Sequence, residues 1–210
     1  MDNIIIFGHS VSQGFWDEKG GWVQRLRSFL DKRALKTQDE EKVFYTFNAS
    51  ISGDTTEDIL ERLEEEYRRR GGEEYEELLL IQIGTNDAII EDGESRVSKK
   101  DFSDNMGKIT ELGKKLSDHL IIVGDFPVNP EMEEIPYAPQ KILRNSDVRE
   151  YDEEKKKICR EKDVDFIDLF ELMDSRKNME YLEEGVHPNS KGHKLVYEKV
   201  KEVLQNEKMI

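Results

Sequence analysis

Four short polar segments of the chain hold residue types that could do chemistry together. The first, Gly8–Gly14, carries Ser10 directly after an apolar run, so its hydroxyl would be exposed where the chain turns. The second, Asn48–Asp54, carries Gly53, and a glycine near the start of a helix lets backbone N–H groups approach an anion. Taken alone, each segment is a weak signal, because serine and glycine are ordinary residues of turns and helix entries.

The third and fourth segments add an amide and an imidazole. Asn86 lies in Gly84–Asp87, and its side-chain N–H could donate to a developing oxyanion. His187 lies in Glu184–Pro188, where the carboxylate of Glu184 could accept the ring Nδ1–H and leave Nε2 free to act as a base. A tight turn would explain either segment alone. The four together supply the parts of a serine nucleophile, a general base and an oxyanion site.

Short apolar runs alternate with helical patterns along the chain, and these elements must position the four segments. The runs are rich in β-branched, aromatic and leucine residues, and their nearly continuous apolarity suits strands buried on both faces of a parallel sheet. The alternation predicts an α/β fold with right-handed crossovers, in which functional segments gather at the carboxyl edge of the sheet. The expected strands are Asn3–Phe7, Val43–Asn48, Leu78–Ile83, Leu120–Val123 and Val164–Ile167.

Two local features refine this outline. Asp54 and Ser98, each followed three residues later by an acid, are the expected N-caps of two helices. Phe126–Pro139 holds four of the five prolines, which excludes a regular helix or a central strand. A long loop there could face a ligand or form an irregular surface connection, and the sequence favours neither.

Composition limits the classes of partner. The 210 residues suit one domain, and the formal net charge of −15 disfavours nucleic-acid binding and adhesion to anionic membranes. The charge also argues against strongly anionic substrates unless a local basic patch exists. Ile4–Phe7 is too short for a signal-peptide core or a membrane span, and the single cysteine, Cys159, excludes an intrachain disulfide, so a cytoplasmic protein is expected. The oligomeric state is not indicated.

No cofactor is expected. Cys159 stands far from all four histidines in the sequence, so no zinc-site spacing is present and no metal is assigned. His119 is expected to open a strand and His193 to begin the last helix, without a chemical role. The GxSxG motif of nucleophile-elbow esterases and the Walker phosphate loop are both absent from the sequence.

In their order along the chain, the four segments resemble the four conserved blocks of the SGNH hydrolases, also called GDSL-type esterases. The stretches GTND and GVHP are closely similar to two of these blocks, and VDFIDLFELM resembles the family's fifth strand and the segment after it. The resemblance therefore spans essentially the whole chain. The family's serine, glycine, asparagine and histidine fall on Ser10, Gly53, Asn86 and His187.

The resemblance implies a three-layer α/β/α sandwich around a five-stranded parallel sheet, of flavodoxin-like type. It also implies a small-molecule ester substrate that is cleaved through an acyl-enzyme, with Ser10 as nucleophile, His187 as general base and Glu184 as the acid that orients it. The Ser10 and Gly53 N–H groups and the Asn86 side chain would form the oxyanion hole. Carboxylic esters with short acyl or acetyl groups come first among the substrates, ahead of thioesters and lysolipids.

The sequence departs from the family pattern at two positions. His9 stands where the family usually has Asp before the serine, and Glu184 stands where it usually has Asp three residues before the histidine. Neighbouring residues usually point in different directions, so His9 is expected to be a local structural substitute rather than a second base. Glu184 can still orient a histidine if its backbone or rotamer shifts to fit the extra methylene, and Glu183 is the less favoured stand-in.

Two other classes of function fit parts of the sequence. The departures at His9 and Glu184 are compatible with a non-catalytic relative that keeps the fold and binds a small molecule. A flavodoxin-like binder would use residues 8–14 to cradle a flavin phosphate. That alternative leaves Asn86 and the pairing of Glu184 with His187 unexplained.

Overall fold

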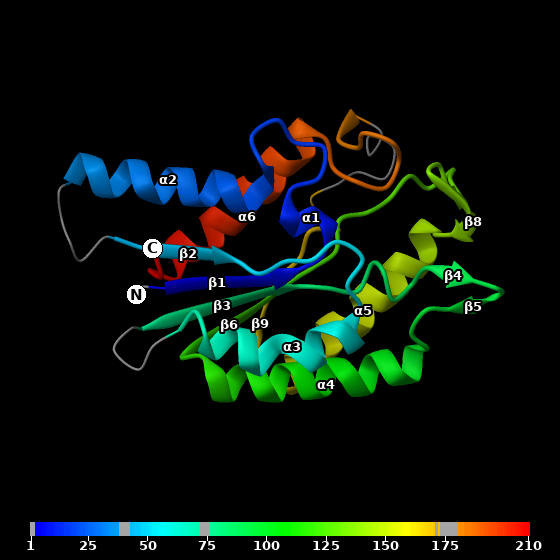
Figure 1. The fold of residues 1–210 in the computed structure, drawn as a ribbon, viewed down its shortest axis with the longest axis horizontal. Coiled ribbons are helices and arrows are strands. Elements are labelled where there is room, and N and C mark those ends of the chain that lie inside the picture. Colours follow the sequence, from blue (N-terminus) through cyan, green and yellow to red (C-terminus); the bar gives the residue numbers. More distant parts are fainter. Residues whose placement is uncertain (1–2, 38–42, 72–75, 171, 173–179) are drawn as a thin grey trace.

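The computed structural model describes residues 3–37, 43–71, 76–170, 172 and 180–210 of the chain. Its centre is a parallel sheet of five strands in the order β2-β1-β3-β6-β9, which Figure 1 shows running through the middle of the molecule. All the expected strands are present, with small shifts at their ends. Their bounds are Asn3–Gly8 for β1, Tyr45–Asn48 for β2, Glu77–Gln82 for β3, His119–Val123 for β6 and Asp165–Ile167 for β9.

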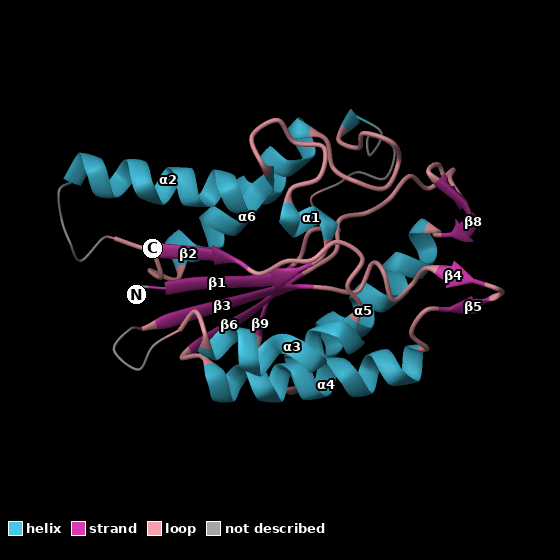
Figure 2. Cartoon of the chain, viewed as in Figure 1, coloured by secondary structure: helices cyan, strands magenta, loops and turns pink. Residues whose placement is uncertain are grey.

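Helices cover both faces of this sheet, as Figure 2 shows, so the predicted three-layer sandwich is confirmed. Helices α2 and α6 pack together on one face, while α3, α4 and α5 form a layer on the other. Alternate strand residues enter two apolar cores: Ile4 and Ile6 join the core under α2 and α6, and Ile5 and Phe7 join the opposite core. The helix bounds are Gly21–Thr37 for α2, Thr56–Arg68 for α3, Lys99–Leu116 for α4, Asn145–Glu161 for α5 and Ser190–Asn206 for α6.

The burial of the sheet differs between its centre and its edges. Every residue of β1 and of β3 is buried, as their apolar runs predicted. The same prediction is wrong for β2, where Tyr45 is 53% exposed. The reason is that β2 is an edge strand with β1 as its only neighbour in the sheet.

One of the two expected helix caps is confirmed. Ser98 precedes α4, and its hydroxyl oxygen accepts the Asp101 N–H at 3.1 Å. The expected cap at Asp54 is wrong, because α3 begins after Thr55, whose N–H donates to Asp58 Oδ2 at 2.8 Å in a capping box. Asp54 therefore lies one residue too early in the chain for that role.

A second, antiparallel sheet lies beyond the carboxyl ends of the parallel strands (Figure 1), and the sequence did not predict it. Its order is β5-β4-β8-β7. The proline-rich segment contributes β7, Glu134–Ile135, and the start of β8, Ala138–Ile142, and it forms no helix, as expected. The exclusion of a central strand is wrong, because β8 lies between β4 and β7. The sheet tolerates Pro139 because β8 pairs with β4 at Ile142, beyond the proline. Strand β4 spans Ile90–Glu91 and β5 spans Glu94–Ser95.

Among the described residues, no helix combines the length and the apolarity needed to cross a membrane. The cytoplasmic location and the organisation as one domain stay predictions.

Candidate active site

Ser10 lies where the central strand β1 turns into the short helix α1, Ser10–Gln13. The turn requires glycine at Gly8, because a Cβ at that position would meet a carbonyl oxygen of β3 at 2.8 Å. His9 is the N-cap of α1, and its Nδ1 accepts the Val11 N–H at 3.3 Å. Ser10 is therefore held at the carboxyl edge of the sheet, at the first position of a capped helix.

His187 approaches Ser10 from the other end of the chain. Its Nε2 lies 2.8 Å from Ser10 Oγ, and the ring is almost fully buried. At the opposite edge of the ring, Nδ1 contacts one carboxylate oxygen of Glu184, and the other oxygen accepts the backbone N–H of His187 at 3.4 Å. With Nδ1 protonated, Nε2 can accept the hydroxyl hydrogen of Ser10, which is the arrangement a general base needs.

Glu184 reaches the imidazole although it is one methylene longer than aspartate. Gly185, next in the chain, has a φ of 101°, and this left-handed conformation turns the backbone between the acid and the histidine. Burial by itself would raise the pKa of the Glu184 carboxyl, but the hydrogen bond with His187 and the ring's positive charge hold that pKa below its ordinary value. Glu184 is therefore an ionised partner of the ring, whereas Glu183 is exposed.

The three groups expected to bind an oxyanion border one pocket beside the serine hydroxyl. The N–H groups of Ser10 and Gly53 donate to no other group in the described part of the chain. Gly53 has a φ of 91°, which glycine adopts without strain. Asn86 is oriented by the hydrogen bond that its Nδ2 donates to the Asp54 carbonyl oxygen at 2.9 Å, and its second amide hydrogen is left for a ligand.

A buried polar network lies beneath the serine, and sequence reasoning did not find it. Asp125 Oδ1 accepts the Thr85 hydroxyl at 2.9 Å and lies 3.5 Å from His9 Nε2, so the His9 ring faces this acid and not the Ser10 hydroxyl. Asp125 Oδ2 accepts from Lys155 Nζ at 2.6 Å, and both side chains are fully buried. Desolvation opposes the charge on Asp125, but the Lys155 ammonium outweighs it and holds the pKa of the carboxyl below its ordinary value.

Three aromatic side chains surround His187 and were also missed by sequence reasoning. Tyr137 stacks on the imidazole with 5.9 Å between ring centroids, and its hydroxyl lies 3.5 Å from Nδ1. Burial and the Glu184 charge raise the pKa of Tyr137 to about 12, so its hydroxyl keeps its proton at neutral pH. Phe15 and Trp16 lie 5.6 and 6.4 Å from the imidazole centroid. The available signal was an adjacent Phe-Trp pair directly after the serine segment.

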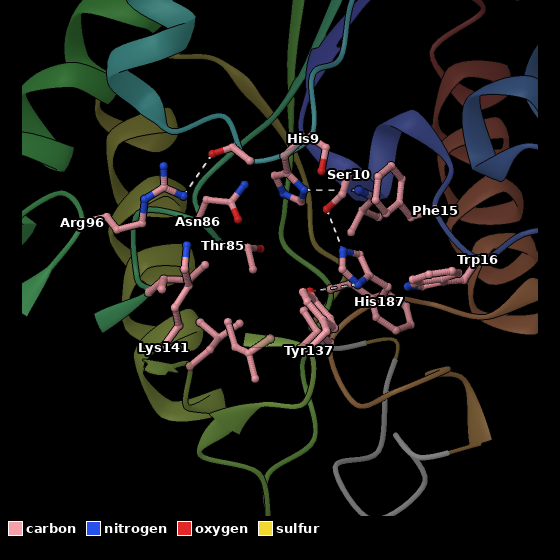
Figure 3. Close-up of a pocket in the computed structure, with 18 residues that line it drawn as sticks. His9, Ser10, Phe15, Trp16, Thr85, Asn86, Arg96, Tyr137, Lys141 and His187 are labelled. Atoms are coloured by element: carbon pink, nitrogen blue, oxygen red, sulfur yellow. Dashed lines mark hydrogen bonds between the residues drawn. The ribbon is translucent and has the colours of Figure 1, made fainter. Parts of the chain in front are cut away.

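These groups enclose a pocket of about 420 Å³, drawn in Figure 3, whose size suits a small organic ligand. Figure 3 shows Trp16 and His187 on one side of the pocket and Arg96 and Lys141 on the other. The proline-rich segment takes part in the lining through Tyr137, so of its two interpretations the structure supports the ligand-facing one.

Within residues 3–37, 43–71, 76–170, 172 and 180–210, no group of three or more His, Cys, Asp or Glu side chains could hold a metal ion. His193 lies near the start of α6, as expected, and its Nε2 lies 2.8 Å from the Phe15 carbonyl oxygen. The Ser10 hydroxyl contacts His187 and the Ser12 hydroxyl donates to Gln82 at 2.6 Å, so neither is left for a flavin phosphate.

Comparison with known proteins shows similarity to hydrolases along nearly the whole chain. The model of the GDSL-like lipase/acylhydrolase family matches residues 6–195. A GDSL esterase/lipase from Oryza sativa subsp. japonica is 27% identical over 212 residues, covering 96% of this chain and 77% of that protein. A lipase/acylhydrolase from Enterococcus faecalis has a TM-score of 0.72 at 23% identity, covering 99% of this chain and 97% of that one. An acetylxylan esterase from Geobacillus stearothermophilus has a TM-score of 0.71 at 18% identity, covering 96% and 93%.

Proposed function

Since the chain belongs to the GDSL-like lipase/acylhydrolase family and is a carboxylic ester hydrolase, we propose that it cleaves short acyl esters through an acyl-enzyme on Ser10. The observation that carries this proposal is the 2.8 Å contact between Ser10 Oγ and His187 Nε2. It joins a hydroxyl that could attack a carbonyl to the nitrogen that could take its proton. A relative that only binds a small molecule would not require this pair, nor the acid behind it.

The first half-reaction begins when Ser10 Oγ attacks the acyl carbon of the ester. His187 Nε2 takes the hydroxyl proton as the new C–O bond forms, and the carbonyl electrons move onto its oxygen. Glu184 stabilises the imidazolium, because its ionised carboxylate contacts Nδ1. The Ser10 and Gly53 N–H groups and the Asn86 amide line the same pocket, and we assign them as donors to the oxyanion.

The two products leave one after the other. The tetrahedral intermediate collapses, and the imidazolium of His187 protonates the oxygen of the departing alcohol. In the second half-reaction, water gives a proton to His187 and attacks the acyl carbon. The new tetrahedral intermediate collapses, and His187 returns the proton to Ser10 Oγ as the carboxylic acid leaves. The alcohol leaves on the His187 side of the pocket, where Phe15, Trp16 and Tyr137 would contact it.

The pocket supports a small substrate. A volume of about 420 Å³ suits a short acyl group and part of its alcohol. The exposed aromatic side chains around His187 suit a ring-shaped alcohol such as a sugar, and an acetylxylan esterase is among the structurally similar proteins. We therefore place short acyl esters, acetylated sugars included, ahead of thioesters and lysolipids.

Ser10→Ala tests this proposal. Hydrolysis of 4-nitrophenyl acetate by the purified protein should fall by about a thousandfold or more, because no nucleophile remains. The melting temperature should change little, since a hydroxyl at a turn contributes little to the core. Ser146→Ala, at an exposed position of α5, is the matched control and should keep wild-type activity. A wild type no faster than Ser10→Ala would favour the non-catalytic binding relative instead.

A further inference from the structure

The lining of the pocket carries a charge unlike that of the rest of the protein. The chain has 47 acidic residues against 32 lysines and arginines, a formal net charge of −15. Of the 18 described residues that line the pocket, the cations are Arg96 and Lys141, and none is Asp or Glu. A concave site of one sign concentrates its field on a ligand of the opposite sign. The sequence argued against anionic substrates unless a local basic patch exists. Arg96 and Lys141, which form one wall of the pocket, are such a patch.

Arg96 directly follows β5, and its side chain is 28% exposed. Its Nη1 donates to the Gly53 carbonyl oxygen at 3.1 Å, which places the guanidinium beside the proposed oxyanion hole. That bond uses one of five N–H donors of the guanidinium. The remaining donors can hold a planar anion such as a carboxylate.

Lys141 lies on β8, and its Nζ is 2.7 Å from an oxygen of Glu91. Arg96 Nε lies 3.9 Å from the same oxygen. The hydrogen bond from Lys141 lowers the pKa of Glu91, so this carboxylate is ionised. Glu91 itself does not line the pocket. The two cations share Glu91, and the carboxylate of Asp58 also interacts with Arg96. Because none of the described lining residues is a carboxylate, the charges that face the cavity are positive.

We infer that the wall formed by Arg96 and Lys141 is a subsite for a carboxylate at the end of the substrate's acyl chain. The inference rests on the proposed function and narrows its substrate class to monoesters of short dicarboxylic acids. His187 must protonate the leaving oxygen, so the alcohol faces His187, and the acyl chain takes the other side. Figure 3 shows both cations across the pocket from Trp16 and His187. The lining of the pocket also includes apolar side chains that methylenes could contact, among them Ile89, Ile135 and Leu143.

The test compares esters that share a leaving group and differ only in terminal charge. The 4-nitrophenyl monoesters of glutarate and adipate are measured against their methyl-capped counterparts, with hydrolysis by Ser10→Ala subtracted as background. A charge-assisted contact predicts a kcat/KM about tenfold or more higher for the charged esters in the wild type. Added salt should reduce this ratio. Lys141→Met and Arg96→Met should each bring it towards one, mainly through KM.

The controls separate charge recognition from damage to the site. Lys157→Met and Arg68→Met remove surface cations that are also ion-paired but lie outside the pocket, and both should keep the wild-type ratio. Because Arg96 also holds Gly53, the rate with the neutral esters reports any disturbance of the oxyanion hole. Lys141→Met measures the loss of charge without this complication, because Lys141 pairs with Glu91 and not with a residue of the oxyanion hole.

Four results would overturn the inference. A wild-type ratio near one, or an unchanged ratio in Lys141→Met, would remove the subsite while hydrolysis of the neutral esters kept the proposed function intact. A second substrate pair, 4-acetoxybenzoate and its methyl ester, places the carboxylate on the alcohol. A preference for charge in that pair alone would show that the acyl-side placement is wrong. Failure of every ester to react faster with wild type than with Ser10→Ala would contradict the proposed function and the subsite with it.

Discussion

Replacing Glu184 with glutamine would remove one charge from the proposed triad while nearly preserving the side chain's shape. Glu184 contacts His187 Nδ1, and its carboxylate is ionised in spite of its burial because of that contact. When His187 takes the Ser10 proton, the ring becomes positive and this carboxylate is the anion at its far edge. The glutamine amide supplies no charge. Its N–H₂ group could also face Nδ1 and favour the tautomer in which Nε2 is protonated and cannot act as a base.

Coulomb's law gives the size of the effect. At an effective dielectric constant of about 20 and a charge separation of about 4 Å, an ion pair is worth about 4 kcal/mol. This attraction exists only once the imidazolium has formed. Its loss would therefore raise the activation free energy by up to about 4 kcal/mol, which lowers kcat by up to about a thousandfold. The Glu184 side chain keeps 19% exposure, and water screens part of the interaction. We therefore expect kcat to fall about a hundred- to a thousandfold, with little change in KM.

The assay is steady-state hydrolysis of 4-nitrophenyl acetate, with thermal unfolding measured in parallel to show that each variant is folded. Glu184→Asp keeps the charge with a shorter reach, so its kcat should lie near that of the wild type and far above that of Glu184→Gln. Glu183→Gln removes the same charge from the exposed neighbour and should stay within about twofold of the wild type.

Retention of most of the wild-type kcat by Glu184→Gln would refute this reasoning. The reaction would then depend on a dyad of Ser10 and His187, or on another group at Nδ1. Tyr137, whose hydroxyl lies 3.5 Å from Nδ1, is the nearest alternative, and the double variant with Tyr137→Phe would show whether it compensates.

Two further outcomes concern the segment after β3. Asn86→Ala should lower kcat about a hundred- to a thousandfold with KM nearly unchanged, because the Asn86 amide would bind charge that exists only in the transition state. An unchanged kcat with a raised KM would show that Asn86 contacts the substrate in the ground state instead. Burial raises the pKa of Asp87 from 3.8 to about 7, so the folded state binds the proton more tightly than the unfolded state does. The protonated acid therefore contributes to the free energy of unfolding below about pH 4, and this contribution is lost as the pH rises to about 7. Across that range the melting temperature of Asp87→Asn should rise relative to the wild type, with the exposed Asp104→Asn as control; parallel curves would show that Asp87 is ionised throughout.

The amino-acid sequence by itself determined the strands and the places where reactive segments leave them. A strand buried on both faces must be apolar along its length, so β1 and β3 could be read from continuous apolar runs. A chain that leaves such strands in tight turns needs residues such as Gly8 and Gly84. Parallel strands end at the same edge of a sheet, and this rule brings Ser10 and Asn86, which follow β1 and β3, to one pocket.

Only the tertiary structure decided what these residues meet. Ser10 and His187 are 177 positions apart, so their contact depends on how α6 and the sheet pack together. The buried partner of His9 and the positive wall of the pocket come from other elements, and β4 and β5 are too short to show a periodic pattern. The physical reason is the distance along the chain over which each interaction acts. Backbone propensity and apolar periodicity act between near neighbours, whereas burial, charge pairing and the shape of a pocket depend on which distant segments the fold brings into contact.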